Sequence, residues 1–133
     1  MNLRTIAFSD YDQLIPFWRE NYFVSEMDSA ERFKLFLEKN PDLSVLIEEN
    51  ERIIGSALGS FDGRRGYIQK VVTSKELRKR GIGKQLMNEV IKRLRKLGVL
   101  YIPINVENEL VGFYEKNGFK RTEQTPMSIS FDK

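Results

Sequence analysis

The 133-residue sequence contains no cysteine and no histidine. These two absences exclude a disulfide framework, a thiolate nucleophile, a zinc site built from Cys and His, and a histidine general base. A thiol-linked acyl-enzyme is excluded too, because it requires a cysteine. Any catalysis has to use carboxylates, tyrosine, lysine, hydroxyl groups, backbone amides or water, and we predict no metal site.

Long apolar runs are also missing. The longest, residues 99–104, has the length of a strand and is interrupted by Pro103, whereas a membrane-spanning helix needs about 20 apolar residues. The first residues carry no apolar core of the kind found in signal peptides. We therefore expect a cytoplasmic protein with no membrane partner.

The charge balance is only mildly basic. Lys and Arg number 22 and Asp and Glu 19, for a net charge of +3, with 41% hydrophobic and 31% charged residues. This composition is ordinary for a soluble globular protein and suits an anionic ligand without requiring nucleic acid. The length predicts a single domain over residues 1–133.

Apolar spacing and turn signals predict strands and helices along the whole chain, with no linker or repeat. Strands are expected at residues 3–7, 43–47, 52–61, 67–73, 99–106, 119–122 and 127–131. A first helix begins at Asp10, and a second follows the capping pattern of Asp28 and Glu31 and ends at Asn40-Pro41. Two further helices are expected at residues 83–97 and 109–117. The resulting order is β-α-α-β-β-β-α-β-α-β-β.

The most informative segment is Arg78-Lys79-Arg80-Gly81-Ile82-Gly83-Lys84, between a β-branched run and a strongly periodic helix. Glycine lets the chain come close to a ligand, and the amides of a first helical turn point at an anion. The helix dipole adds partial positive charge there. The segment therefore predicts a pyrophosphate-binding loop.

Two common nucleotide motifs do not fit this loop. A dinucleotide fingerprint needs a third glycine where Leu86 stands, and a P-loop needs Ser or Thr where Gln85 stands. The plain alternative is a basic helix start with a glycine turn. Four cations at that position oppose the helix dipole, and an arriving anion explains them better.

Two motifs together carry a resemblance to a known family. The pattern Arg78-x-x-Gly81-x-Gly83, after the strand segment 71–78, is followed downstream by Phe113-Tyr114-Glu115-Lys116-Asn117-Gly118-Phe119. Both resemble the GCN5-related N-acetyltransferase (GNAT) family, and the predicted element order matches it. The resemblance implies a mixed, mostly antiparallel seven-stranded sheet flanked by four helices. Pro103 suits the splay between the family's fourth and fifth strands, or a simple bulge.

The resemblance also implies a coenzyme A site. The strand backbone at Val71, Val72 and Thr73 would pair with the pantetheine arm, and an amide near Val71 or Val72 would face the acetyl carbonyl. The loop amides would hold the pyrophosphate. The implied cofactor-binding residues are Val71, Val72, Thr73, Arg78, Lys79, Arg80, Gly81, Ile82, Gly83, Lys84 and Asn108.

Tyr114 is the catalytic candidate that the resemblance implies. A tyrosine stays protonated at neutral pH and can donate to a departing thiolate. Without the family, a core aromatic on a short amphipathic helix would be the plainer interpretation. The family usually has an asparagine seven residues before this tyrosine, where this chain has Glu107, so either Asn108 takes that role or the contact is lost.

The general base stays open between four carboxylates and an ordered water. Glu26 and Asp28 lie in the connection between the first two helices, where family members often contact the acceptor, and Glu107 and Glu123 are the others. A solvated surface charge is the plainer interpretation of each.

The resemblance implies transfer of an acetyl group from acetyl-coenzyme A directly to an amine, small or peptidic, in a ternary complex. A non-catalytic coenzyme A-binding regulatory module is the alternative. Nucleic-acid binding through residues 75–84 and the cations at 92–96 is not favoured, because Glu76 and Glu89 dilute the patch. Free sheet edges and Phe131 leave a homodimer open, and the acceptor is not readable from the sequence.

Overall fold

The computed structural model describes residues 1–131. The chain divides into two compact units, residues 1–103 and residues 104–133, and each is described by itself. The first unit holds the sheet and three helices. Within residues 1–131, no helix is long and apolar enough to cross a membrane.

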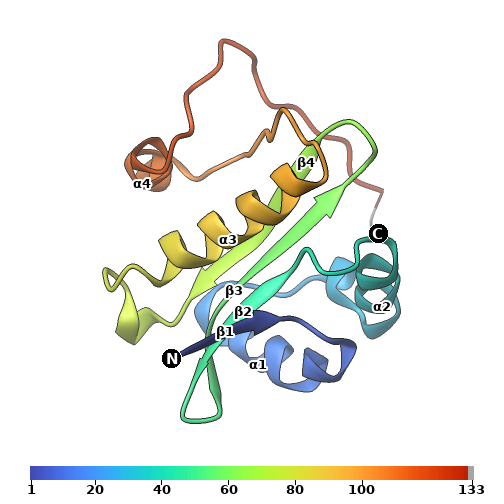
Figure 1. Ribbon diagram of the computed structural model, residues 1–133, viewed down its shortest axis with the longest axis vertical. Coiled ribbons are helices and arrows are strands. Elements are labelled where there is room, and N and C mark those ends of the chain that lie inside the picture. The colour runs from blue at the N-terminus through green and yellow to red at the C-terminus, as the bar shows by residue number, and fades with distance from the viewer. Residues whose placement is uncertain (132–133) are drawn as a thin grey trace. The chain divides into compact units, whose positions relative to one another are not determined.

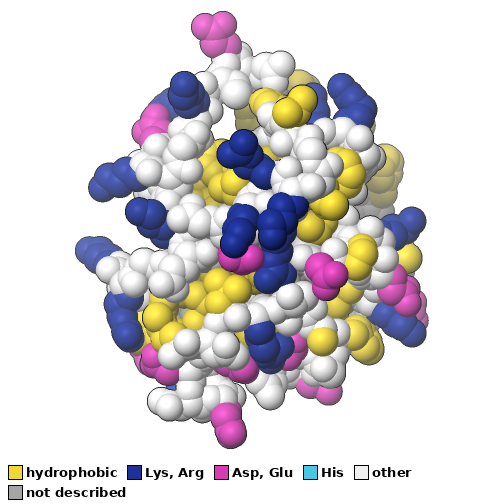
Figure 2. All heavy atoms as spheres, viewed as in Figure 1, with side chains coloured by type: hydrophobic (Ala, Val, Ile, Leu, Met, Phe, Trp, Pro, Cys, Tyr) yellow, Lys and Arg dark blue, Asp and Glu magenta, His cyan; other side chains and the backbone are white. Residues whose placement is uncertain are grey.

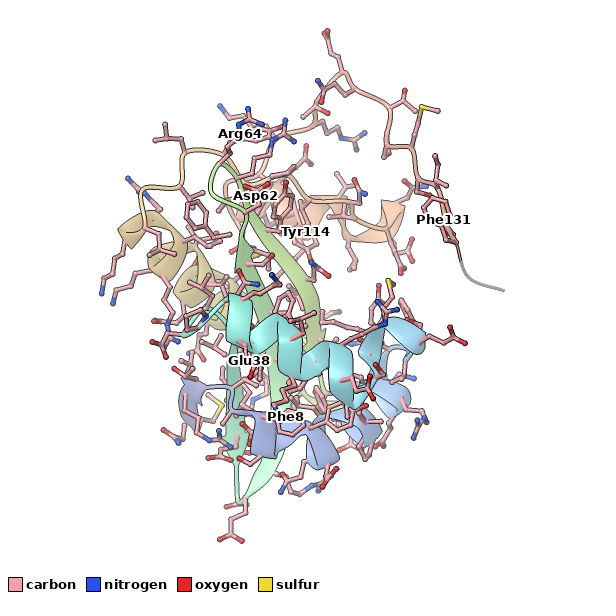
Figure 3. The ribbon with its side chains drawn as sticks, turned by 90° about the vertical axis from the view of Figure 1, so that its right-hand side faces the viewer. Phe8, Glu38, Asp62, Arg64, Tyr114 and Phe131 are labelled. Atoms are coloured by element: carbon pink, nitrogen blue, oxygen red, sulfur yellow. The ribbon has the colours of Figure 1, made fainter. Side chains whose placement is uncertain are left out.

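The sheet of the first unit has four strands in the order β1-β2-β3-β4, all antiparallel. They are β1 (Asn2–Thr5), β2 (Val45–Glu49), β3 (Arg52–Phe61) and β4 (Gly66–Thr73). A short turn joins β2 to β3, and another joins β3 to β4. Asn50 and Glu51, both at positive φ, join β2 to β3, as a two-residue hairpin requires. In the β3–β4 turn, Asp62 accepts hydrogen bonds from the Arg64 and Arg65 amides. Asp62 and Arg64 are labelled in Figure 3.

Four α-helices and four short 3₁₀ turns complete the structure. The helices are α1 (Tyr11–Asn21), α2 (Ala30–Lys39), α3 (Ile82–Lys96) and α4 (Val111–Lys116). The turns are η1 (Phe8–Asp10), η2 (Glu26–Asp28), η3 (Lys75–Leu77) and η4 (Asn108–Leu110). The four predicted helices are therefore confirmed, with ends that differ by a few residues.

Strand β3 separates the helices of the first unit into two layers. A Cβ added at Gly55 would lie 2.7 Å from Ile82 of α3, and one at Gly59 would lie 2.7 Å from Val90 of the same helix. Ser56, between them, accepts a hydrogen bond from Trp18 of α1 instead. Because side chains alternate across a strand, α3 covers one face of the sheet and α1 the other (Figure 1).

The helix α3 is fixed by its apolar face, all of it buried: Ile82, Leu86, Met87, Val90 and Leu94. Fully burying such a side chain contributes about 1.5–3 kcal/mol. The glycines of β3 let the helix backbone come close. A Cβ at Gly59 would also lie 2.5 Å from the Leu43 carbonyl oxygen, so Gly59→Ala would break this packing.

The predicted seven-stranded mixed sheet is wrong. The sheet has four strands, and in residues 1–131 the predicted strands at 99–106, 119–122 and 127–131 do not form. Next to β4, the Gly66 amide donates to the Tyr101 carbonyl at 3.1 Å. That contact does not extend into a ladder, and Pro103 has no amide to extend it. The architecture remains an α/β fold.

The second unit contains η4 and α4, and little of it is buried. Tyr114 is 8% exposed, with Phe113 and Phe119 packed edge-on at ring-centroid distances of 5.2 and 5.6 Å. Met127, Ile129 and Phe131 alternate as strand residues do, but 80–92% of each side chain is exposed. Alternation stabilises a strand only where another element covers its apolar side.

Candidate functional site

The predicted cofactor strand carries a β-bulge. Ser56 pairs with Val72 and Leu58 pairs with Gln69, so Lys70 and Val71 of β4 stand opposite Ala57 alone. Lys70 adopts a left-handed conformation, φ 50°. Bulges re-aim side chains and interrupt pairing, and they are common beside active sites. This one lies at the start of the segment predicted to pair with pantetheine.

β4 is also an edge strand, since it pairs with β3 on one side only in the four-stranded sheet. Val72 is buried, and Val71 and Thr73 are partly buried. An edge strand can accept an extended ligand as an added strand. The geometry of residues 71–73 therefore permits the predicted pantetheine contact.

The loop after β4 ends in a helix start that no side chain caps. Lys79 (φ 72°) and Gly81 (φ 79°) are both left-handed, and Gly81 is the N-cap of α3. Gln85 donates the first helical bond, to the Gly81 carbonyl, so the amides before it have no acceptor within the helix. The first turn contains no acidic residue. This is the arrangement that binds an anion.

Basic side chains surround this helix start. Lys75, Arg78, Lys79, Arg80 and Lys84 are all exposed or partly exposed, and in residues 1–131 none of them forms an ion pair. Figure 2 shows Lys and Arg side chains along this side of the molecule, including the left edge where the loop lies in Figure 1. Their charge opposes the helix dipole, so a bound anion would relieve it.

Two contacts hold the loop in place. Asn21, buried at the end of α1, accepts a hydrogen bond from the Lys75 amide at 2.9 Å through its Oδ1. At the other end, Ile82 is 1% exposed and packs over Gly55. The loop is therefore anchored on both sides of its glycine turn.

The predicted residues fall into two groups. Residues 71–73 and 78–84 lie together in the first unit, from the end of β4 to the first turn of α3. Tyr114 and Asn108 belong to the second unit, Tyr114 in α4 and Asn108 as the exposed first residue of η4.

The candidate general bases differ in their surroundings. Asp28 is engaged: its Oδ2 lies 3.1 Å from the Lys70 Nζ and accepts the Ser25 amide at 2.9 Å. Glu107 and Glu123 are exposed, as is Glu26. The Asp28 side chain is 10% exposed and its Oδ2 is already engaged, so Asp28 is the least accessible of the four to an amine. The described residues contain no cluster of Asp and Glu able to hold a metal ion.

Sequence reasoning missed two residues of this region, Asn21 and Lys70. A lysine inside the β-branched run 67–73 was the available signal, because a charge there needs a partner. The partners, Asp28 and the aromatic rings of residues 18–23, are about forty or more residues away in sequence. Only the tertiary structure reveals them.

Comparison with known families shows which family this chain belongs to. The model of the "Acetyltransferase (GNAT) family" matches residues 11–119. The chain therefore belongs to this family of acetyltransferases.

Individual relatives are similar to the chain in sequence or in fold. The chain is 28% identical over 120 residues to Acetyltransferase ECA0875 from Pectobacterium atrosepticum, covering 87% of this chain and 85% of that protein. Glucosamine-6-phosphate N-acetyltransferase from Arabidopsis thaliana has a similar fold, with a TM-score of 0.76, 23% identity and 98% of both chains covered. The PaiA N-acetyltransferase from Thermoplasma acidophilum, solved in complex with coenzyme A, gives a TM-score of 0.79 at 21% identity, covering 93% of this chain and 92% of that one.

Proposed function

We propose that this protein is an acetyl-coenzyme A-dependent N-acetyltransferase that transfers the acetyl group directly to an amine in a ternary complex. The observation that carries the proposal is the uncapped start of α3, where left-handed Lys79 and Gly81 precede amides with no acceptor in the helix. Membership of the acetyltransferase family supports it. The lack of cysteine favours direct transfer, because no thiol is present to carry the acetyl group.

In this proposal the donor lies along β4 and the loop. Val71, Val72 and Thr73 pair with pantetheine, an amide at Val71 or Val72 polarises the acetyl carbonyl, and residues 78–84 bind the pyrophosphate. Asn108 contributes a further cofactor contact. The similar acetyltransferase from Thermoplasma acidophilum binds coenzyme A in its crystal structure, which supports coenzyme A as the ligand here.

The proposed reaction is a nucleophilic displacement. The acceptor arrives as an ammonium ion and first loses a proton to Glu26, Glu107, Glu123 or an ordered water. The resulting neutral amine attacks the thioester carbon, the C–S bond breaks, and Tyr114 donates its proton to the departing thiolate. The attacking nitrogen then gives up its second proton, which leaves a neutral amide and restores the tyrosine hydroxyl. The proposal specifies the acceptor only as an amine and does not choose among these bases.

Binding and turnover are tested separately. Acetyl-coenzyme A at a hundred times its Kd should stabilise the protein by about 2.7 kcal/mol, seen as a rise in Tm. Thiol release is then followed with small amines, polyamines and peptides. Stabilisation without thiol release across the panel would favour the non-catalytic coenzyme A-binding module, and no stabilisation would contradict both functions.

The role of Tyr114 has its own test. Tyr114→Phe keeps the ring between Phe113 and Phe119 and removes only the hydroxyl. We expect kcat to fall about 10²–10⁴-fold, the usual contribution of a general acid, while the Kd for acetyl-coenzyme A stays within about twofold of the wild type. Full activity of the Phe variant would remove Tyr114 from the mechanism.

A further inference from the structure

The ammonium group of Lys70 is enclosed rather than solvated. Its side chain is 10% exposed, and Nζ donates to the Phe23 carbonyl at 2.7 Å and lies 3.1 Å from Asp28 Oδ2. Nζ also lies 4.4, 5.1 and 5.3 Å from the ring centroids of Phe23, Trp18 and Tyr22. These distances are within the range of cation–π attraction. One side chain thus gathers partners from α1 and from the segment that follows it.

That segment, residues 22–28, is the connector between α1 and α2. Apart from the single turn η2 it has no regular structure, and Tyr22, Phe23 and Met27 are 48%, 48% and 73% exposed. Loops with few buried contacts open easily. Lys70 ties the connector to the sheet through Phe23 and Asp28, at opposite ends of it.

The bulge makes this contact possible. Lys70 lies in the left-handed region (φ 50°), which is unfavourable for a residue with a Cβ. The Lys70 carbonyl accepts a hydrogen bond from Ser56 Oγ at 3.3 Å, and Ser56 Oγ in turn accepts the Trp18 indole N–H at 2.8 Å. A strained conformation persists where its surroundings fix it. Here the strained residue is the one directly before Val71.

We propose that Lys70 is a positioning residue that ties the connector to the cofactor strand, so that acetyl-coenzyme A binding at residues 71–73 also orders residues 22–28. The inference rests on the proposed function, which assigns residues 71–73 to the cofactor. Its consequence is that the connector, with its exposed Tyr22, Phe23 and Met27, responds to the donor before any acceptor is present.

Amide hydrogen exchange with and without acetyl-coenzyme A tests the coupling. In the wild type the cofactor should slow exchange at residues 71–73 and, at least about threefold, at residues 22–28. In Lys70→Met the connector should exchange at least about tenfold faster, and the cofactor should slow residues 71–73 only. Lys70→Arg keeps the cation and should restore the cofactor response of the connector.

Tyr11→Phe is the matched control for simple loosening. The Tyr11 hydroxyl donates to the Asp28 carbonyl at 2.7 Å, so it ties the connector to α1 and not to the sheet. This variant should raise connector exchange and retain the cofactor-induced slowing. Lys34→Met, at an exposed lysine of α2, should behave as the wild type.

The outcomes separate the two proposals. If residues 22–28 exchanged in Lys70→Met as slowly as in the wild type, the proposed role of Lys70 would be overturned. It would also be overturned if the cofactor no longer slowed exchange at residues 22–28 in Tyr11→Phe. Slowing at residues 71–73 with none at residues 22–28 in the wild type would contradict the coupling and leave the proposed function standing. No slowing at residues 71–73 in the wild type would contradict the proposed function itself.

Discussion

Helices α2 and α3 begin in opposite ways. At α2, Ser29 is the N-cap and its hydroxyl accepts the Arg32 amide at 3.3 Å, and Glu31 places a negative charge in the first turn. At α3, a left-handed glycine is the N-cap, no side chain caps the turn, and Lys84 places a positive charge there. The start of α2 thus has its own hydrogen-bond acceptor and negative charge. The start of α3 has neither, so its free amides and its helix dipole favour a bound anion.

Among changes at the helix starts, the largest expected effect is on coenzyme A affinity in Gly81→Ala. Gly81 and Gly98, at the two ends of α3, are both left-handed, with φ of 79° and 89°, and an added Cβ meets nothing within 4 Å at either. Both Ala variants should therefore lose about 1 kcal/mol of stability.

Only the change at Gly81 places a methyl group where the pyrophosphate is proposed to bind. Its Kd for coenzyme A should rise about 30-fold, or 2 kcal/mol, the size of one hydrogen bond to a charged group. Calorimetric titration gives the Kd, and urea denaturation checks the matched stabilities. Equal affinities in the two variants would contradict the assignment of the loop.

A charge reversal separates stability from binding. Lys84→Glu should raise the free energy of unfolding by about 0.5 kcal/mol, because an acid in the first turn favours the dipole. The same change should weaken coenzyme A binding about tenfold, which corresponds to 1.4 kcal/mol. Arg32 occupies the same position in the first turn of α2. Arg32→Glu should therefore raise the free energy of unfolding by a similar amount and leave coenzyme A binding unchanged.

Removing the α2 cap gives the complementary result. Ser29→Ala should cost about 1 kcal/mol of stability, as N-cap deletions commonly do. Coenzyme A affinity should stay within about twofold, since Ser29 caps a helix away from the loop. Thermal denaturation and calorimetric titration measure the two quantities, and a large affinity loss would show that the two helix starts are not independent.

The start of α1 adds a small, pH-dependent effect. Burial raises the pKa of Asp10, but hydrogen bonds from Arg4 and from the Ala7 amide outweigh it and hold the pKa below its usual 3.8. A lowered carboxylate pKa stabilises the fold above the unfolded value and loses that contribution as pH falls through the folded one.

Arg4→Met removes most of this contribution. Since Arg4 is 35% exposed, we expect a difference in unfolding free energy of about 0.5 kcal/mol at pH 7. The difference should shrink as the pH falls below the unfolded-state value of 3.8 and through the lower pKa that Asp10 has in the folded protein. Urea denaturation at about pH 7, 5 and 3.5 measures it, and a difference that grows on acidification would contradict the assigned pKa direction.

The sequence predicts best where local patterns decide the structure. The strand over Arg52–Phe61 has the predicted bounds, and the glycine turn before α3 lies where residues 81 and 83 indicate. The alternation of Met127, Ile129 and Phe131 predicted a strand that does not form, because no neighbouring strand covers these residues in the described structure. The Lys70 contacts could not be predicted, since they depend on the approach of β4 to a loop some forty residues earlier in the chain.

The central claim is that the amides at the start of α3 bind the pyrophosphate of coenzyme A. The most direct measurement follows the ¹H and ¹⁵N resonances of the protein during titration with coenzyme A. The amides of residues 81–84 should shift downfield as they donate to phosphate oxygens, while those of residues 30–32 at the capped start of α2 stay in place. Saturable shifts elsewhere with unchanged resonances at residues 81–84 would contradict the claim.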